Sequence, residues 1–198
     1  MSSDVMVKSY PATEVDLHEA VRYAGGGDSE DILSLVDSCV SEIEGRLRGN
    51  VCYVILDVNI TRDECDFGVF KVRSKNLAKN LSGVKRVILF GATVGVEIDR
   101  LIARYSARSP VRAVVLDGIG AERIEALCDS FCSDMKRELG VNLRPRFSPG
   151  YGDLDISAQK DIFRVLDCPR KIGLCLTDSM LMSPSKSVTA FVGISRDS

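Results

Sequence analysis

Apolar segments with strand character are few in this chain, and helical patterns of unequal length separate them. Five short segments are rich in β-branched or aromatic residues: residues 51–58, 67–72, 84–90, 171–176 and 188–194. A parallel sheet needs a regular alternation of strand and crossover helix, and this spacing does not provide one. The pattern therefore predicts an α+β fold, a single domain over residues 1–198 in which helices flank a largely antiparallel sheet.

Apolar residues that recur every three or four positions mark the helices between these segments. The predicted helices cover residues 29–49, 74–81, 93–105, 121–139 and 157–169, and the apolar run 111–116 is expected to be buried. Ser74 and Ser157 stand where N-caps are expected, and Gly140 and Pro169 stand where helices should end.

The first 28 residues carry the weakest periodicity and end in Gly25-Gly26-Gly27. The Gly-Lys-Ser/Thr ending of a phosphate-binding loop does not follow these glycines. The extreme N-terminus also lacks the basic and apolar regions of a signal peptide. We therefore expect residues 1–28 to be a loosely packed segment and the protein to be cytoplasmic.

Charge balance excludes two classes of partner. The chain has 26 basic and 28 acidic residues, a net charge of -2, so it lacks the basic excess of a nucleic-acid-binding protein. The longest stretch without a charged residue is 87–96, about half of the roughly 20 residues that a membrane-spanning helix needs. We expect neither nucleic acid nor a membrane to be a partner.

The cysteines and the histidine do not predict a metal site. The seven cysteines are odd in number and contain no Cys-x-x-Cys pair. Cys128 and Cys132 are four residues apart and could share a soft metal, but they follow an apolar helical stripe, where free thiols act as small hydrophobic groups. His18 has no second histidine or cysteine nearby, so we expect no bound metal and no Ser-His-Asp triad.

Residues 87–95 offer one candidate binding motif. A predicted strand runs into Gly91-Ala92-Thr93-Val94-Gly95 and then into a predicted helix, as at the start of a dinucleotide-binding unit. Only two of the three glycines of that motif are present. An NAD(P)-binding oxidoreductase-like domain built around Gly91 and Gly95 is one alternative, and a non-catalytic scaffold that binds a protein partner is another.

A second candidate site lies between the long helix and the last one, in Arg146-Phe147-Ser148-Pro149-Gly150-Tyr151. Proline followed by glycine suits the two central positions of a type II turn. A nearby arginine can grip a carboxylate with two hydrogen bonds, and a tyrosine offers a flat apolar face. This combination fits a ligand with a carboxylate at one end and a heterocycle at the other. A surface turn without a ligand remains the alternative.

A third segment, residues 176–188, is too polar for a core strand and too apolar for a free loop. Its Met180, Leu181 and Met182 would form an adaptable apolar surface that could meet a cofactor or partner. The alternative is a loop that folds back on the core.

The second and third segments together resemble the activation domain of cobalamin-dependent methionine synthase. The resemblance rests on Arg146-x-x-Pro149-Gly150-Tyr151 followed by Leu176-Thr177-Asp178-Ser179-x-x-Met182-x-Pro184-x-x-Ser187-Val188. Residues 91–100 and 115–120 are similar to stand-alone forms of that domain. The resemblance extends over about residues 80 to 195.

The resemblance implies a reactivation function. Domains of this family bind S-adenosylmethionine and present its methyl group to a cobalamin (corrinoid) held by another module or protein. A flavodoxin- or ferredoxin-type electron donor first reduces the oxidised corrinoid. The chain would then be a component of a cobalamin-dependent methyltransferase and not a complete enzyme, with methionine synthase modules or another corrinoid protein as its partner in trans.

The resemblance also implies roles for individual residues. Arg146 would bind the ligand carboxylate, the backbone of residues 147–150 would contact the adenosyl part, and Tyr151 would lie near the methyl group and the corrin. An acidic group for the ligand ammonium is expected, and Asp134 is a candidate. The chain departs from the family after Tyr151, where it has Gly152-Asp153-Leu154-Asp155 and no histidine.

Overall fold

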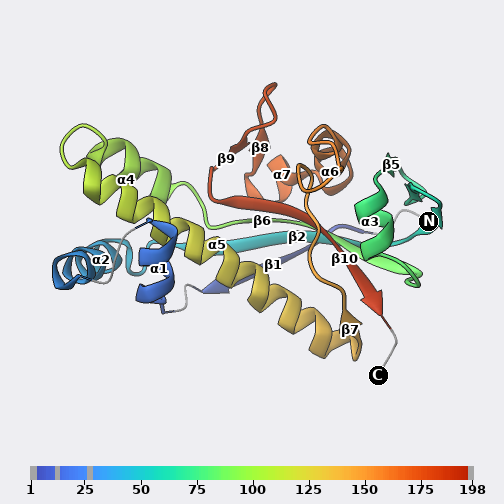
Figure 1. The fold of residues 1–198 in the computed structure, drawn as a ribbon, viewed down its shortest axis with the longest axis horizontal. Helices are drawn as coiled ribbons and strands as arrows, with labels where there is room; N and C mark the ends of the chain where they lie inside the picture. Colours follow the sequence, from blue (N-terminus) through green and yellow to red (C-terminus); the bar gives the residue numbers. More distant parts are fainter. Residues whose placement is uncertain (1–3, 12–13, 26–28, 196–198) are drawn as a thin grey trace.

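The computed structural model describes residues 4–11, 14–25 and 29–195. Within them, one antiparallel sheet forms the centre of the molecule, with its strands in the order β1-β2-β6-β10-β7 (Figure 1). Its strands are β1 (Met6–Pro11), β2 (Arg48–Asp57), β6 (Arg86–Thr93), β7 (Asn142–Leu143) and β10 (Ser187–Ser195). The predicted α+β class and largely antiparallel sheet are confirmed.

Smaller elements complete the sheet structure. A second antiparallel sheet packs beside α3, and a two-stranded hairpin precedes β10. The second sheet consists of β3 (Asn59–Thr61), β4 (Glu64–Asp66) and β5 (Lys71–Arg73), and the hairpin of β8 (Cys175–Leu176) and β9 (Met182–Ser183). The predicted strand at 67–72 is therefore wrong over most of its length. Phe67 and Phe70 flank a turn instead, in which the Phe67 N–H donates to the Phe70 carbonyl.

Helices cover both faces of the main sheet and build a separate lobe (Figure 1). The helix bounds are α1 (Leu17–Tyr23), α2 (Glu30–Ile43), α3 (Lys75–Asn80), α4 (Glu97–Tyr105), α5 (Pro110–Leu139), α6 (Ala158–Leu166) and α7 (Cys168–Ile172). The second half of α5 packs on one face through Phe131, which contacts Tyr53 and Phe90. Helices α3, α6 and α7 cover the other face, and α1, α2 and α4 pack around the first half of α5. No helix in the described ranges is long and apolar enough to span a membrane.

Helix α5 begins at Pro110 and not at the predicted residue 121, and it runs unbroken through Gly118 and Gly120. Asp117-Gly118-Ile119-Gly120 therefore lies inside the helix. Helix α1 crosses α5 so closely there that a Cβ on Gly118 would stand 2.6 Å from the carbonyl oxygen of Ala20. The two glycines therefore serve helix packing. The run 111–116 is only half buried, since Val111 and Val114 face outward.

The N-terminal segment packs more closely than the loose lead-in expected from sequence. Strand β1 pairs with β2 along its full length, and α1 buries Ala20 and Val21. Gly26, Gly27 and Asp28 lie outside the described residues. The following helix begins as expected, with Ser29 capping the Ile32 N–H. It ends at Ile43 and not at residue 49, because β2 already begins at Arg48.

The predictions around residues 166–176 need correction. Pro169 does not end the last helix but lies in the first turn of α7, where a proline needs no hydrogen-bond partner for its nitrogen. Asp167, with φ 51°, separates α6 from α7. The predicted strand 171–176 is therefore helical at its start, and only Cys175 and Leu176 are extended.

Candidate functional site

The loop from Arg144 to Ser157 lies beside β10 at the edge of the main sheet and is anchored there by Phe147. The Phe147 N–H donates to the Phe191 carbonyl at 2.9 Å, and the Phe191 N–H returns the bond at 2.9 Å. The Phe147 side chain is buried in the core beneath α6. This residue therefore fixes the position of its neighbours on both sides.

The next four residues form the turn that the sequence predicted. The Tyr151 N–H donates to the Ser148 carbonyl at 3.1 Å, and Gly150 has φ +86°, which favours glycine. The Gly150 N–H donates to the Leu154 carbonyl at 2.8 Å, so a second hydrogen bond within the loop holds the turn in place. Tyr151 is left 69% exposed, with its ring edge-on to Phe147 at 5.4 Å between centroids.

Arg146 is held against α5 by two carboxylates. Its Nη2 lies 2.6 Å from Oε2 of Glu125, and its Nη1 lies 2.5 Å from Oδ1 of Asp129. Glu125 and Asp129 are four residues apart and therefore lie on one face of α5. Burial lowers the pKa of Arg146, but the effects of Cys128, Asp129 and Glu125 are together larger and raise it, so the pKa lies above its ordinary value. One guanidinium and two carboxylates give this cluster a net negative charge.

A groove of about 670 Å³ opens over this cluster. It is lined by Asn76, Lys79 and Asn80 of α3, Glu125 of α5, Val188 of β10, and Arg144, Pro145, Arg146, Phe147, Ser148 and Tyr151 of the loop. The structure thus brings four of the six predicted site residues to one groove, whereas Pro149 and Gly150 shape the turn behind it. Val188 is the contribution of the third segment, whose Leu181 is 67% exposed just before β9.

Asp153 ties the loop to the start of α3. Its Oδ1 accepts hydrogen bonds from Ser74 Oγ at 2.5 Å and from the Asn76 N–H at 3.1 Å, and its Oδ2 accepts the Lys75 N–H at 2.8 Å. The Ser74 hydroxyl first, and then these backbone bonds, lower the pKa of Asp153. The residues after Tyr151, which depart from the family pattern, thus fix one wall of the groove.

The acidic residues near Arg146 were missed in the sequence. Asp134 lies further along α5 than Glu125 and Asp129. It pairs with Arg137 at 2.6 Å and is not in the groove lining. Glu125 lies beside Arg146 instead. An acidic pair at positions i and i+4 next to the apolar stripe of α5 was the available signal, but only the tertiary structure shows that it faces the loop.

The residues of the dinucleotide-binding alternative do not form a phosphate site. Gly91 lies inside β6, which continues to Thr93 between two antiparallel neighbours. A Cβ on Gly91 would stand 3.1 Å from Sγ of Cys168, so this glycine leaves room for α7. The strand–turn–helix unit of a dinucleotide site is therefore replaced by a strand in an antiparallel sheet.

The thiols near the site are packing groups. Cys128 is fully buried under the main sheet, where burial raises its pKa, and burial also raises the pKa of Cys132. Over the described parts of the chain, no three His, Cys, Asp or Glu side chains are grouped as metal ligands would be.

Comparison with known proteins gives two positive results. The family described as vitamin B12 dependent methionine synthase, activation domain, matches residues 74–198. A crystal structure of the MetH reactivation domain bound to AdoHcy superposes with a TM-score of 0.72 at 14% identity, covering 99% of this chain and 80% of that one. No curated protein matches the sequence.

Proposed function

The chain belongs to the vitamin B12 dependent methionine synthase activation domain family, and on that basis we propose that its groove binds S-adenosylmethionine for the reductive methylation of a corrinoid. One observation carries the proposal for this groove. Arg146, which is predicted to bind the carboxylate of the ligand, lies there with its guanidinium between Glu125 and Asp129.

The charges of this cluster complement those of S-adenosylmethionine. The ligand carries one carboxylate, one ammonium and one sulfonium, so it offers an anion to the Arg146 guanidinium and cations to the neighbouring carboxylates. In the proposed complex, the ligand carboxylate takes one side of the Arg146 fork and replaces Asp129, which is the more exposed partner. Glu125 stays beside the fork and accepts hydrogen bonds from the ammonium.

The loop backbone would read the adenosyl part. The N–H groups of Phe147 and Gly150 are already bonded within the protein, and Pro149 has none. The ligand would therefore meet the Ser148 N–H and the outward carbonyl groups of the turn. The exposed Tyr151 at the rim would lie between the bound methyl donor and a corrinoid brought by a partner.

The work of this site is positioning. The methyl group is already activated by the sulfonium, so no acid or base is required of the protein. The corrinoid enters as a substrate held by a methionine synthase module or another corrinoid protein. One electron from a flavodoxin- or ferredoxin-type donor converts cob(II)alamin to cob(I)alamin, which then takes the methyl group and leaves S-adenosylhomocysteine.

A ligand panel tests the proposal directly. Thermal unfolding is measured with S-adenosylmethionine, S-adenosylhomocysteine, NAD and NADP, because a ligand at 100 times its Kd adds about 2.7 kcal/mol of stability. We expect stabilisation by the first two only. Stabilisation by NAD or NADP alone would support the dinucleotide alternative, and no stabilisation by any of the four would support the scaffold.

A second experiment tests the role of Tyr151. Tyr151→Phe should bind S-adenosylmethionine nearly as well as the wild type but should slow methylation of a reduced corrinoid protein, measured by the change in its absorption spectrum. Equal losses in binding and methyl transfer would place the phenol at the ligand carboxylate instead.

A further inference from the structure

Two thiols meet in the core between β2 and α7. Cys52 and Cys168 are 116 positions apart in the sequence, but their Sγ atoms lie 3.7 Å from each other. Both side chains are fully buried. A disulfide joins two sulfurs at about 2.05 Å, so a small displacement of the two side chains would bring them to bonding distance. The pair is therefore placed to form a cross-link between two distant parts of the chain.

The space for this pair is provided by Gly91. This glycine stands opposite Cys52 where β2 pairs with β6. A Cβ on Gly91 would stand 3.1 Å from Sγ of Cys168 and 3.6 Å from Sγ of Cys52. Both sulfurs therefore lie over the place where Gly91 has no side chain, and a larger residue at this position would compete with them for the same space.

The environment of Cys52 differs from that of a thiol buried alone. Burial raises the pKa of Cys65 to about 11, and no neighbouring group opposes this effect. At Cys52, in contrast, the hydrogen bond with Cys168 lowers the thiol pKa by more than burial raises it. Thiol–disulfide exchange begins with attack by a thiolate, so a lower pKa favours the reaction at this pair over the reaction at Cys65.

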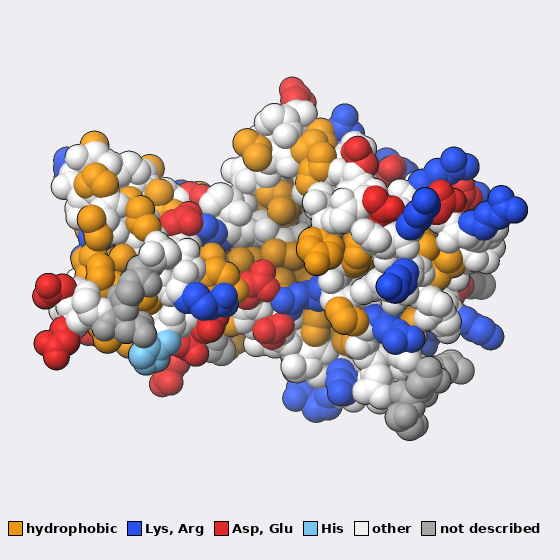
Figure 2. All heavy atoms as spheres, in the orientation of Figure 1, with side chains coloured by type: hydrophobic (Ala, Val, Ile, Leu, Met, Phe, Trp, Pro, Cys, Tyr) orange, Lys and Arg blue, Asp and Glu red, His pale blue; other side chains and the backbone are white. Residues whose placement is uncertain are grey.

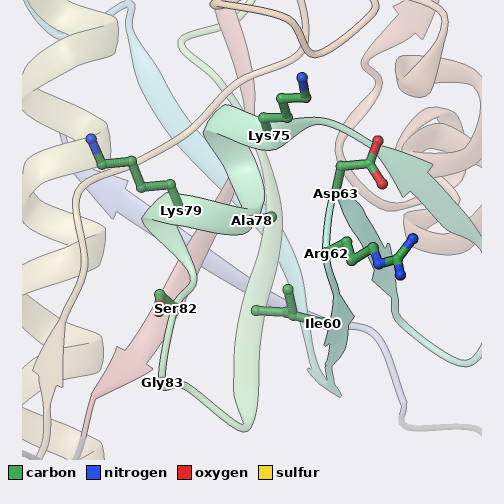
Figure 3. Close-up of a pocket in the computed structure, with 8 residues that line it drawn as sticks. All are labelled: Ile60, Arg62, Asp63, Lys75, Ala78, Lys79, Ser82 and Gly83. Carbon is green, nitrogen blue, oxygen red and sulfur yellow. The ribbon is translucent and has the colours of Figure 1, made fainter.

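The cavities on this side of the main sheet do not reach the two sulfurs. A pocket of about 760 Å³ lies beside α3, and neither cysteine lines it (Figure 3). Neither cysteine lines the groove over Arg146. Figure 2 shows Lys, Arg, Asp and Glu side chains gathered over the end of the molecule that carries α3 and β5. An oxidant therefore has to wait for a local opening of the structure.

Helix α7 is the element whose opening would expose the pair. Cys168 is its first residue, and the helix has only five residues. Residues with positive φ bound it on both sides, Asp167 at 51° and Gly173 at 68°. Cys52, in contrast, lies on β2, which is paired with β1 and β6. Because short elements open more easily than the strands of a central sheet, Cys168 would be the first of the two sulfurs to meet an oxidant.

We propose that Cys52 and Cys168 are a reversible oxidation site, a dithiol that closes to a disulfide between β2 and α7. The oxidant is a small-molecule disulfide such as glutathione disulfide. One protein thiolate attacks it and releases a first small thiol, and the second protein thiolate then displaces the other half as a second small thiol. One S–S bond is broken and one is formed, and the two protons of the protein thiols end on the two small thiols. The inference rests on the packing of the two cysteines and goes beyond the proposed function.

Thiol counting after treatment with glutathione disulfide tests the proposal. Cys175→Ser is the parent variant, because Cys175 is exposed and would react first, and it leaves six of the seven cysteines. The treated protein is unfolded in an alkylating reagent and mapped by mass spectrometry. Two of the six thiols should be lost together, in one peptide pair that joins Cys52 to Cys168. Dithiothreitol should restore both thiols. The oxidised form should melt at a higher temperature than the reduced form, because the cross-link restricts the unfolded chain.

Two matched variants of the parent separate this pair from the other buried thiols. Adding Cys52→Ala should abolish the cross-link, whereas adding Cys65→Ala should leave it intact. Six free thiols in the treated parent would overturn the proposal, and so would a disulfide between other cysteines or a glutathione adduct on Cys168 without a cross-link. The peptide map of the parent decides the question even where Cys52→Ala does not fold. Failure to bind S-adenosylmethionine would refute the proposed function and leave the thiol count interpretable.

Discussion

The Asp153 carboxylate accepts a hydrogen bond from the Ser74 hydroxyl at 2.5 Å, across 79 positions of sequence. Ser74 is itself the N-cap of α3 and accepts the Leu77 N–H at 2.9 Å. The pair therefore connects the first turn of α3 to the loop that carries Arg146 and Tyr151. Both walls of the groove depend on this connection.

Removing the Asp153 carboxylate should loosen the loop. Asp153→Ala leaves the Ser74 hydroxyl and two backbone N–H groups without their partner, so we expect a lower melting temperature and weaker S-adenosylmethionine binding. Asp155→Ala is the matched control, because Asp155 bonds within its own loop, to the N–H and the side chain of the nearby Ser157. Thermal unfolding and calorimetric titration measure the two effects. A smaller loss of stability in Asp153→Ala than in the control would contradict this prediction.

The contribution of Asp153 should also depend on pH. Its folded pKa is lowered from the ordinary 3.8, so its stabilisation is complete above that value and is lost as pH falls through the folded pKa. The stability difference between wild type and Asp153→Asn should therefore be constant from neutral pH down to about pH 5 and shrink at lower pH. Urea unfolding of both proteins across this range measures it. A difference that grows on acidification would show that the sign is wrong.

Arg146→Lys should weaken S-adenosylmethionine binding more than folding. Lysine keeps the charge but loses the two-pronged geometry, so the affinity should fall roughly ten- to a hundred-fold. The ion pairs are partly exposed, so the stability loss should be about 1 kcal/mol or less. Arg137→Lys is the control, because it alters an exposed ion pair on α5 away from the groove. It should leave the S-adenosylmethionine affinity unchanged. Equal affinity for Arg146→Lys and the wild type would remove Arg146 from the site.

Glu125→Gln separates the two acidic candidates for the ligand ammonium. If Glu125 accepts hydrogen bonds from the ammonium, its neutral amide should reduce S-adenosylmethionine affinity about tenfold. Asp134→Asn should have no effect, because Asp134 faces Arg137 and lies outside the groove lining. Calorimetry on both variants measures this contrast. The reverse order of effects would return the role to Asp134.

Gly150→Ala should distort the turn as well as strain it. An L-residue in the left-handed region costs about 1–2 kcal/mol. The new Cβ would also stand 3.1 Å from Cδ1 of Ile156. Gly68→Ala is the matched control, since Gly68 has φ +78° and open space around its Cβ position. Both variants should lose stability, but only Gly150→Ala should lose S-adenosylmethionine affinity in a titration. Unchanged affinity in Gly150→Ala would mean that the turn does not shape the site.

Features that depend on residues close together in the chain can be predicted from the amino-acid sequence alone. The caps at Ser29, Ser74 and Gly140 and the turn at Pro149-Gly150 lie where local chemistry predicts them. The apolar patterns located the central strands to within a few residues and predicted their antiparallel arrangement. These features follow from backbone conformation and side-chain periodicity, which a few neighbouring residues decide.

The contacts between distant segments, in contrast, become apparent only in the folded protein. The sequence could not show that β1 would pair with β2, or that α1 would cross α5 closely at Gly118. Nor could it show that Arg146 would meet Glu125, 21 positions earlier. A residue type gives a side chain its chemistry, but the partner of that side chain is set by which elements the core brings together. The groove belongs to this second class, because it is assembled from elements that are distant in sequence and joined only by packing.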